Sequence, residues 1–308
     1  FIHAIKIFCF FVGLKYFKFV KMHFLKSYLI VLIVALTFQS SCQQSSIQVL
    51  SWNVFLRPSI MNDGQMDRVS EIGNYLKNSG ADVLVLQEVF HSGARRELKK
   101  QLKSTYPYQT KKGPVTWLGI PSGVVLFSKM PIVKEKVISF SFSKGADRLA
   151  KKGAILVTFE KNGQEIAILG THLQAGSDLS RKKIRNAQIN QISDVVNDID
   201  SNKILIYAGD FNIQNKSNMF VKLKKKIKSN NPKLNKSSRK AATANFKDNN
   251  LYPVTGKPVW IDYIMIRRAE KVLQKSLWVE EPRGKNRRKN KRLSDHNPVL
   301  SIVVYEKK

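Results

Sequence analysis

Short apolar segments recur along the chain between polar ones, and their spacing predicts most of the secondary structure. Runs of apolar and β-branched residues bounded by turn residues are typical of buried strands. Such runs occupy residues 47–55, 82–90, 106–109, 122–127, 132–140, 153–160, 164–172, 204–212, 259–266 and 299–304. Apolar residues at helical spacing predict helices over 66–77, 94–102 and 179–199.

The strongest short-range signal in this pattern is Asn162-Gly163, which joins the runs 153–160 and 164–172. Both residues tolerate the positive φ angles of a two-residue hairpin turn, so an antiparallel hairpin is predicted there. The sequence contains no internal repeat and no long linker after Cys42. We therefore expect one folded domain over residues 46–308.

Several of the predicted strands begin or end in polar residues, although the strands themselves are apolar. Asp210 and Asn212 are two positions apart, so their side chains would point the same way if the strand continued through both. Asp295-His296 stands just before the run 299–304, where an ordinary surface turn is the alternative. The complete set is Asn53, Glu88, His172, Asp210, Asn212, Asp262, Asp295 and His296.

The residue types in this set favour metal-assisted hydrolysis of a phosphodiester. Carboxylates and amides without thiolates suit a hard divalent cation, most naturally Mg²⁺, with Mn²⁺ or Co²⁺ as possible substitutes. A histidine beside such a cation can polarise a water for in-line attack on phosphorus. Cys9 and Cys42 are the two cysteines, so residues after Cys42 form neither a disulfide nor a thiolate metal site.

The charge of the chain adds a second expectation. Its formal net charge is +31, from 53 Lys and Arg against 22 Asp and Glu. This excess predicts attraction to anionic surfaces such as phospholipid, nucleic acid or cell-wall polymer. The basic runs at 222–240 and 283–292 stand out. A general compositional bias toward lysine is the alternative explanation.

The start of the sequence does not follow the pattern of the folded domain. Residues 1–21 mix phenylalanines with lysines, and we treat them as an upstream segment outside the fold. From Met22 a short basic stretch precedes the apolar residues 28–38, and small residues then lead to Cys42. This order predicts a lipoprotein-like signal peptide over 22–41 with Cys42 as the lipidation site, hence export to a bacterial membrane. A secreted protein with an ordinary cleaved signal is the alternative, because Gln39 replaces the usual aliphatic residue.

Six short motifs surround the polar residues and occur in a fixed order along the chain. They are Trp52-Asn53-Val54, Gln87-Glu88-Val89-Phe90, Gly170-Thr171-His172-Leu173-Gln174-Ala175, Gly209-Asp210-Phe211-Asn212, Ile261-Asp262-Tyr263-Ile264 and Ser294-Asp295-His296-Asn297-Pro298. This order resembles the endonuclease/exonuclease/phosphatase superfamily. The resemblance extends over residues 46–305 and implies a four-layer α/β sandwich with two central mixed sheets, the deoxyribonuclease I-like fold. Three stretches, 88–90, 147–153 and 172–175, further resemble the neutral Mg²⁺-dependent sphingomyelinases, including bacterial sphingomyelinase C.

The resemblance implies a role for each metal-site and base residue. Glu88 matches the principal Mg²⁺ carboxylate, and Asn53 lies close to the metal-bound water or phosphate in the family. Asp295 matches an acidic neighbour or a ligand of a second metal ion. His296 matches the general base, and Asp262 the carboxylate that orients its imidazole.

The same comparison implies four contacts to the substrate phosphate or to the attacking water. Asp210 and Asn212 match the pair that positions the nucleophilic water and a phosphoryl oxygen. His172 matches a donor to the phosphate, which would stabilise charge in the transition state. Lys152 matches a further phosphate contact, with a solvated loop lysine as the alternative.

The implied function is an exported, Mg²⁺-dependent phosphodiesterase that hydrolyses sphingomyelin or a related phospholipid to ceramide and a phosphorylated headgroup. The headgroup, the number of metal ions and the oligomeric state stay open at this point. Haemolytic members carry an aromatic hairpin before the Asp-His motif, whereas this chain has Trp278 and the basic run 283–292. Docking on anionic headgroups is therefore expected in place of insertion. The alternative function is an extracellular metal-dependent nuclease on the same scaffold, with nucleic acid as its partner, and the positive charge favours it.

Overall fold

The computed structural model describes residues 44–111, 121–230, 235, 242–244, 251, 257–269, 272–274, 278–283 and 292–306. Residues 44–308 form one compact unit, to which all the described strands and helices belong. The upstream segment 1–21, the signal peptide 22–41 and Cys42 lie outside the described residues, as do parts of the two basic runs. Across the described ranges, no helix is both long enough and apolar enough to cross a membrane.

The first of two sheets contains the first and the last strands of the unit side by side. Its strands are β1 (Gln44–Leu56), β2 (Val83–Val89), β3 (Tyr108–Gln109), β4 (Val125–Ser128), β10 (Val272–Gln274), β11 (Trp278–Val279) and β12 (Val299–Glu306). They follow the order β10-β12-β1-β2-β4-β3, and β11 pairs with β12. Since β1 is antiparallel to β12 and parallel to β2, the sheet is mixed.

The second sheet has five strands in sequence order, and it is also mixed. Its strands are β5 (Lys134–Ser139), β6 (Gly153–Lys161), β7 (Gln164–His172), β8 (Ile204–Asp210) and β9 (Asp262–Ile266). β7 and β8 run parallel, while the other neighbours are antiparallel.

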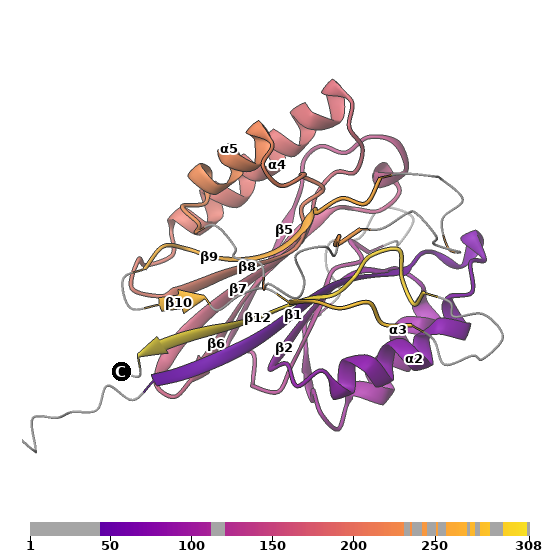
Figure 1. Ribbon diagram of the computed structural model, residues 1–308, viewed down its shortest axis with the longest axis horizontal. Coiled ribbons are helices and arrows are strands. Elements are labelled where there is room, and N and C mark those ends of the chain that lie inside the picture. The colour runs from indigo at the N-terminus through magenta and orange to yellow at the C-terminus, as the bar shows by residue number, and fades with distance from the viewer. Residues whose placement is uncertain are drawn as a thin grey trace, which may run out of the picture. The chain divides into compact units, whose positions relative to one another are not determined.

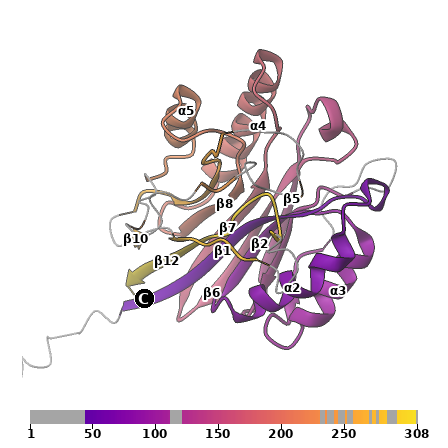
Figure 2. The same ribbon diagram turned by 45° about the vertical axis from the view of Figure 1, so that its right-hand side comes forward.

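Helices cover the outer face of each sheet (Figure 1, Figure 2). The pair α2 (Gln65–Asn78) and α3 (Ser92–Leu102) lies on the first sheet, and α4 (Leu179–Asn197) and α5 (Asn218–Lys226) lie on the second. Two short 3₁₀ helices, η1 (Ser59–Met61) and η2 (Gly145–Arg148), stand in loops.

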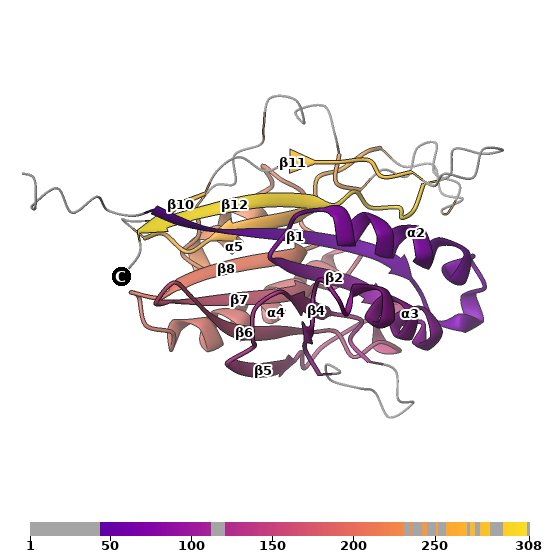
Figure 3. The same cartoon turned by 90° about the horizontal axis from the view of Figure 1, so that it is seen from below.

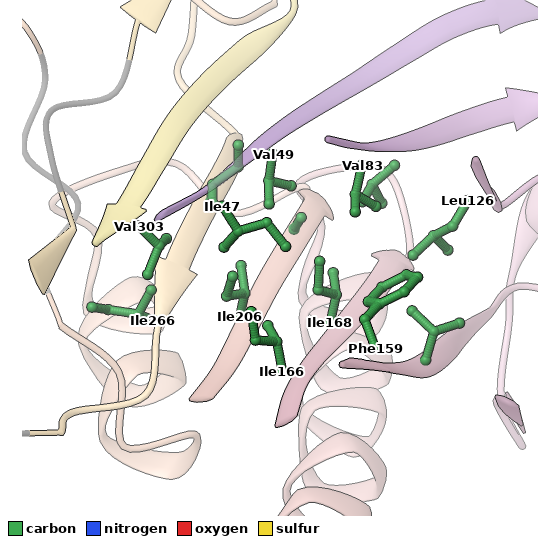
Figure 4. Packing of buried hydrophobic residues seen from close by; sticks show 14 of the residues in the cluster. Ile47, Val49, Val83, Leu126, Phe159, Ile166, Ile168, Ile206, Ile266 and Val303 are labelled. Atoms are coloured by element: carbon green, nitrogen blue, oxygen red, sulfur yellow. The ribbon is translucent and has the colours of Figure 1, made fainter. Parts of the chain in front are cut away.

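Three clusters of buried apolar side chains separate four layers. The inner cluster joins the two sheets, for example Ile47 and Val83 of the first with Ile168 and Ile206 of the second (Figure 4). A second cluster packs α2 and α3 on the first sheet, and a third packs α4 and α5 on the other sheet. This arrangement confirms the predicted four-layer sandwich. A unit with its own complete cores can be expressed by itself.

The burial of the central strands follows from this layering. β2 and β8 have helices on one face and the other sheet on the opposite face, so nearly every side chain is buried. The run 299–304, predicted as a buried strand, lies in β12, whose residues alternate between buried and partly exposed. It lies toward the edge of its sheet, next to the short strands β10 and β11, and only one of its faces is fully covered.

The predicted hairpin forms at Asn162-Gly163. Both residues have positive φ, 53° and 73° respectively, as a type I′ turn requires. β6 and β7 pair from Lys161 and Gln164 next to the turn to Ala154 and Thr171 at the far end. The turn thereby sets the position of His172, the last residue of β7.

Most strands differ from the predicted ranges by one or a few residues at their ends, and two of these differences affect the polar positions. β8 ends at Asp210, two residues early, because Asn212 adopts a left-handed φ of 51°. β9 begins at Asp262, because the backbone N–H groups of Ile261 and Asp262 both donate to Oγ1 of Thr243.

Gly209 of β8 has no room for a side chain against the backbone of β7, and its substitution should destabilise the fold. Its φ is +150°, and a Cβ there would lie 2.0 Å from the carbonyl oxygen of Thr171. We expect Gly209→Ala to lower the free energy of unfolding by about 3 kcal/mol in urea titrations, because backbone must move. Gly80→Ala is the control, since its φ is also positive but the nearest atom is 3.6 Å away. Similar losses in both variants would contradict the steric argument.

Candidate active site

The candidate site lies where β1, β2, β7 and β8 finish and where β9 begins. β7 and β8 place His172 opposite Asp210, and β8 and β9 place Asp210 opposite Asp262. On the first sheet, Asn53 pairs with Gln87, the neighbour of Glu88. Figure 3 shows β1 and β2 running side by side toward this end. The strand-end residues are thus brought together by the pairing of the strands.

His296 and Asp262 form a buried pair. Nδ1 of His296 lies 2.9 Å from Oδ2 of Asp262, and the two side chains are almost inaccessible. The backbone of His296 is held on both sides, because its carbonyl accepts from Nε1 of Trp52 and its N–H donates to Oγ of Ser294. Burial alone would lower the pKa of His296, yet the carboxylates of Asp262, Asp295 and Asp210 together raise it well above its usual value.

Asp210 is the centre of the site, with four groups around one buried carboxylate. Its Oδ2 accepts from Nδ2 of Asn53 at 3.3 Å and lies 3.4 Å from Nε2 of His172 and 3.8 Å from Nε2 of His296. Its Oδ1 accepts from the backbone N–H of Asn212 at 2.8 Å. Burial, and next the charge of Asp262, raise the pKa of Asp210 to about 6.

Glu88 and Asn53 connect the first sheet to this centre. Nδ2 of Asn53 donates to Oε1 of Glu88 at 3.0 Å as well as to Asp210, so one amide joins two carboxylates. Glu88 has a left-handed φ of 57°, which is strained for a non-glycine residue and is found preferentially at functional sites. Burial raises the pKa of Glu88, and the hydrogen bond from Asn53 offsets part of that rise.

Lys152 is buried beside His172, contrary to the alternative of a solvated loop lysine. Its ammonium donates to the carbonyl of Leu173 at 2.9 Å, lies 2.7 Å from Nε2 of His172, and pairs with Asp147 at 3.2 Å. An ammonium group only donates, so Nε2 of His172 accepts and the proton of the neutral ring is on Nδ1. Burial, then Lys152 and His296, lower the pKa of His172 well below its usual value. His172 is therefore neutral.

Asn212 and Asp295 lie at the margin of the site. Nδ2 of Asn212 donates to the carbonyl of Leu173 at 3.1 Å, so this side chain ties β8 to the end of β7. Asp295 is 5% exposed, and burial raises its pKa to about 6. Its charge acts on both His296 and Glu88, which places it near the centre. All nine predicted site residues are thus at this end of the sheets.

The donor set fits a hard divalent cation. Ligand atoms of Asp210, Asp262 and His296 lie within 4.8 Å of one another, and all three residues are buried. Oδ1 of Asp262 has no hydrogen-bond partner among the described residues. Burial raises the pKa of Glu88, Asp210 and Asp295, and a bound cation would favour their charged forms. Carboxylate oxygens at such a position suit Mg²⁺ or a similar ion.

Arg68 of α2 supports the site, a role that was not predicted from the sequence. Its Nη1 donates to the carbonyls of Val54 and Leu293, and its Nη2 donates to the carbonyl of Phe55. These bonds join the end of β1 to the segment that carries His296. A single arginine on an amphipathic helix carries no sequence signal for such a role.

Replacing Arg68 by methionine tests this support. We expect Arg68→Met to lower the free energy of unfolding by about 2–4 kcal/mol, because buried carbonyls lose charge-assisted hydrogen bonds. Arg96→Met on α3 is the control and should change stability by less than about 0.5 kcal/mol. An unchanged melting temperature of Arg68→Met would refute the proposed support.

Comparison with known proteins adds the family context. Residues 50–296 match the Endonuclease/Exonuclease/phosphatase family. Sphingomyelinase C of Leptospira interrogans is 32% identical over 266 residues, which are 77% of this chain and 46% of the relative. Phospholipase C of Staphylococcus aureus is 29% identical over 267 residues, 76% of this chain and 77% of the relative.

A solved structure extends the similarity to three dimensions. A beta toxin double mutant from Staphylococcus aureus with bound magnesium ions has a TM-score of 0.71 and 26% identity to this chain. The match covers 85% of this chain and 100% of the other. The chain spans about half the length of the Leptospira relatives that it matches, 42–46%.

Proposed function

The chain belongs to the endonuclease/exonuclease/phosphatase family, and from that membership we propose that it hydrolyses a phosphodiester bond of a phospholipid. Sphingomyelin is the leading substrate, with ceramide and a phosphorylated headgroup as products. The names of the sphingomyelinase C and phospholipase C relatives support this substrate class. One observation carries the proposal, namely the buried His296–Asp262 pair beside the buried carboxylates of Asp210 and Asp295.

In this proposal His296 is the general base. Asp262 accepts the Nδ1 proton of His296, which fixes the tautomer and leaves Nε2 to accept a proton. A water positioned by Asp210 and Asn212 attacks phosphorus, its proton passes to Nε2, and the bond between phosphorus and the lipid oxygen breaks. The lipid alkoxide then takes a proton from solvent.

The remaining residues bind the phosphate and the cation. Of the acidic and amide groups at the site, Glu88 with Asn53 and Asp295 would hold Mg²⁺, while His296 and Asp262 keep their hydrogen bond to each other. The bound cation would neutralise the phosphoryl oxygens and offset the carboxylates that raise the pKa of His296. Lys152 and His172 would lie beside the phosphate, and Lys152 contributes its positive charge, because its N–H groups already bond to His172, Leu173 and Asp147. The charge of Lys152 would stabilise the phosphate as negative charge grows.

A nuclease on the same scaffold is the second candidate. The net charge of +31 favours it, because neutralisation of phosphates by Lys and Arg drives binding to nucleic acid. We also propose that the protein is exported, through the predicted signal peptide 22–41, and is either secreted or anchored through Cys42.

One assay separates these candidates. Residues 44–308 are incubated with Mg²⁺ and either sphingomyelin in mixed micelles or single- and double-stranded DNA. We expect release of the phosphorylated headgroup without cleavage of DNA, and loss of activity in a chelator that added Mg²⁺ restores. Cleavage of DNA with intact lipid would favour the nuclease. Full activity in the chelator would exclude the metal-dependent mechanism.

A further inference from the structure

Three large apolar side chains are exposed close to the candidate site. Phe142 is 60% exposed, Leu149 58% and Leu179 76%. Phe142 and Leu149 belong to the loop 140–152 between β5 and β6, and Leu179 begins α4. Exposed apolar side chains that gather on one surface indicate contact with a partner or a membrane.

The loop and the helix form one surface. Nζ of Lys144 donates to Oγ of Ser180 at 2.8 Å, and Nε2 of Gln188 donates to the carbonyl of Phe142 at 3.0 Å. The loop therefore lies along the first turns of α4. We call this the rim surface and define it by Phe142, Lys144, Arg148, Leu149, Leu179 and Lys182.

The charged residues of the rim surface are basic. Lys144, Arg148 and Lys182 are exposed, as are the adjoining Lys151 and Lys183. The acidic groups beside them already have partners. Asp178 pairs with Arg181, and Asp147 pairs with the buried Lys152. The surface thus combines exposed apolar groups with an excess of positive charge.

The rim surface is linked directly to the site. Asp147 of the loop accepts from the backbone N–H of Ala175 at 2.8 Å and pairs with Lys152 at 3.2 Å. Lys152 in turn lies 2.7 Å from His172. Asp147 and Lys152 therefore connect the loop of the rim surface to His172, and a partner docked on this loop lies next to the site.

We propose that the rim surface docks on a lipid bilayer that contains anionic lipid. Phe142, Leu149 and Leu179 enter the interface, and the surrounding lysines and Arg148 contact anionic headgroups. Nucleic acid would use the cations and leave the apolar groups in water. This inference rests on the proposed function in one respect, which is that the substrate is a membrane lipid. It adds the surface of the protein across which that lipid reaches the active site.

Vesicle binding by residues 44–308 tests the proposal. The probes are vesicles of phosphatidylcholine alone and vesicles that also contain phosphatidylglycerol. We expect Phe142→Ser/Leu149→Ser/Leu179→Ser to lower partitioning onto the anionic vesicles at least about tenfold, because three apolar groups no longer enter the interface. Lys182→Glu/Lys183→Glu should lower binding to the anionic vesicles by about tenfold and change binding to phosphatidylcholine little.

Matched controls come from other surfaces of the same chain. Val133, Val221 and Leu273 are 57%, 57% and 65% exposed, so their replacement by serine removes similar apolar groups elsewhere. Lys225→Glu/Lys226→Glu makes the same charge change on α5. Both controls should bind within twofold of the unmodified protein. Absence of binding by the unmodified protein, or an equal loss in a control, would overturn the proposal.

A soluble substrate separates this inference from the proposed function. Hydrolysis of bis(p-nitrophenyl) phosphate needs the site but no membrane, so the rim variants should hydrolyse it within twofold of the unmodified protein. If neither the unmodified protein nor any variant hydrolyses bis(p-nitrophenyl) phosphate or lipid, the proposed function fails. Vesicle binding would still test the docking surface in that case. A loss of soluble activity equal to the loss of vesicle binding would contradict a docking role.

Discussion

Replacing His296 by alanine is expected to lower kcat by about a thousandfold, because a positioned general base contributes 10²–10⁴-fold. A thousandfold loss corresponds to about 4 kcal/mol in the activation free energy. The variant should still fold. Its free energy of unfolding should fall by about 1–3 kcal/mol, because the buried Asp262 loses its hydrogen-bond partner. Hydrolysis of bis(p-nitrophenyl) phosphate below the melting temperature measures the effect.

A second histidine provides the matched control for His296. His91 lies outside the site and caps α3, where its Nδ1 accepts from the N–H of Ala94 at 3.1 Å. His91→Ala should cost about 1 kcal/mol of stability, the usual value of an N-cap, and leave kcat unchanged. More than a few per cent of residual activity in His296→Ala would remove this residue from the proton transfer.

Glu88→Gln is expected to weaken Mg²⁺ binding by about a hundredfold or more and to lower kcat by a similar factor, since a carboxylate ligand becomes neutral. Glutamine keeps the shape of the side chain and the acceptor for Nδ2 of Asn53, so the strained backbone at residue 88 is expected to persist. Calorimetric titration with Mg²⁺ measures binding without any substrate.

The control for this variant lies at the opposite end of β7. Glu165 pairs with Lys203 at 2.8 Å on the surface, and Glu165→Gln should alter neither Mg²⁺ binding nor kcat. An unchanged dissociation constant for Mg²⁺ in Glu88→Gln would remove Glu88 from the metal site. A loss of kcat with unchanged Mg²⁺ binding would assign it to another step.

The strands and the candidate site could be predicted from local pattern. β2 and β8 are almost entirely buried and have apolar residues on both faces, and the polar residues at or next to their ends, Glu88 and Asp210, stand out against that background. Asn162-Gly163 predicted its hairpin because few residue pairs tolerate two positive φ angles. Each of these signals is contained in a few consecutive residues, so it can be recognised from the sequence.

Features that depend on distant contacts could not be predicted. The left-handed φ of Asn212 ends β8 early, and its side chain bonds to Leu173 instead of continuing the strand. From the sequence, Lys152 could equally be a solvated loop residue. Its burial depends on three partners, namely His172, the carbonyl of Leu173 and Asp147. Arg68 bonds to carbonyls up to 225 positions away.

The pairing of β1 with β12 has a consequence for synthesis of the chain. The ribosome makes Asn53 well before β12 and His296, and Trp52 and Ser294 make bonds across 244 and 241 positions. Contacts of such large sequence separation form late in folding. Until residues 294–306 have been made, the nascent chain therefore lacks both its candidate base and the strand that pairs with one edge of β1.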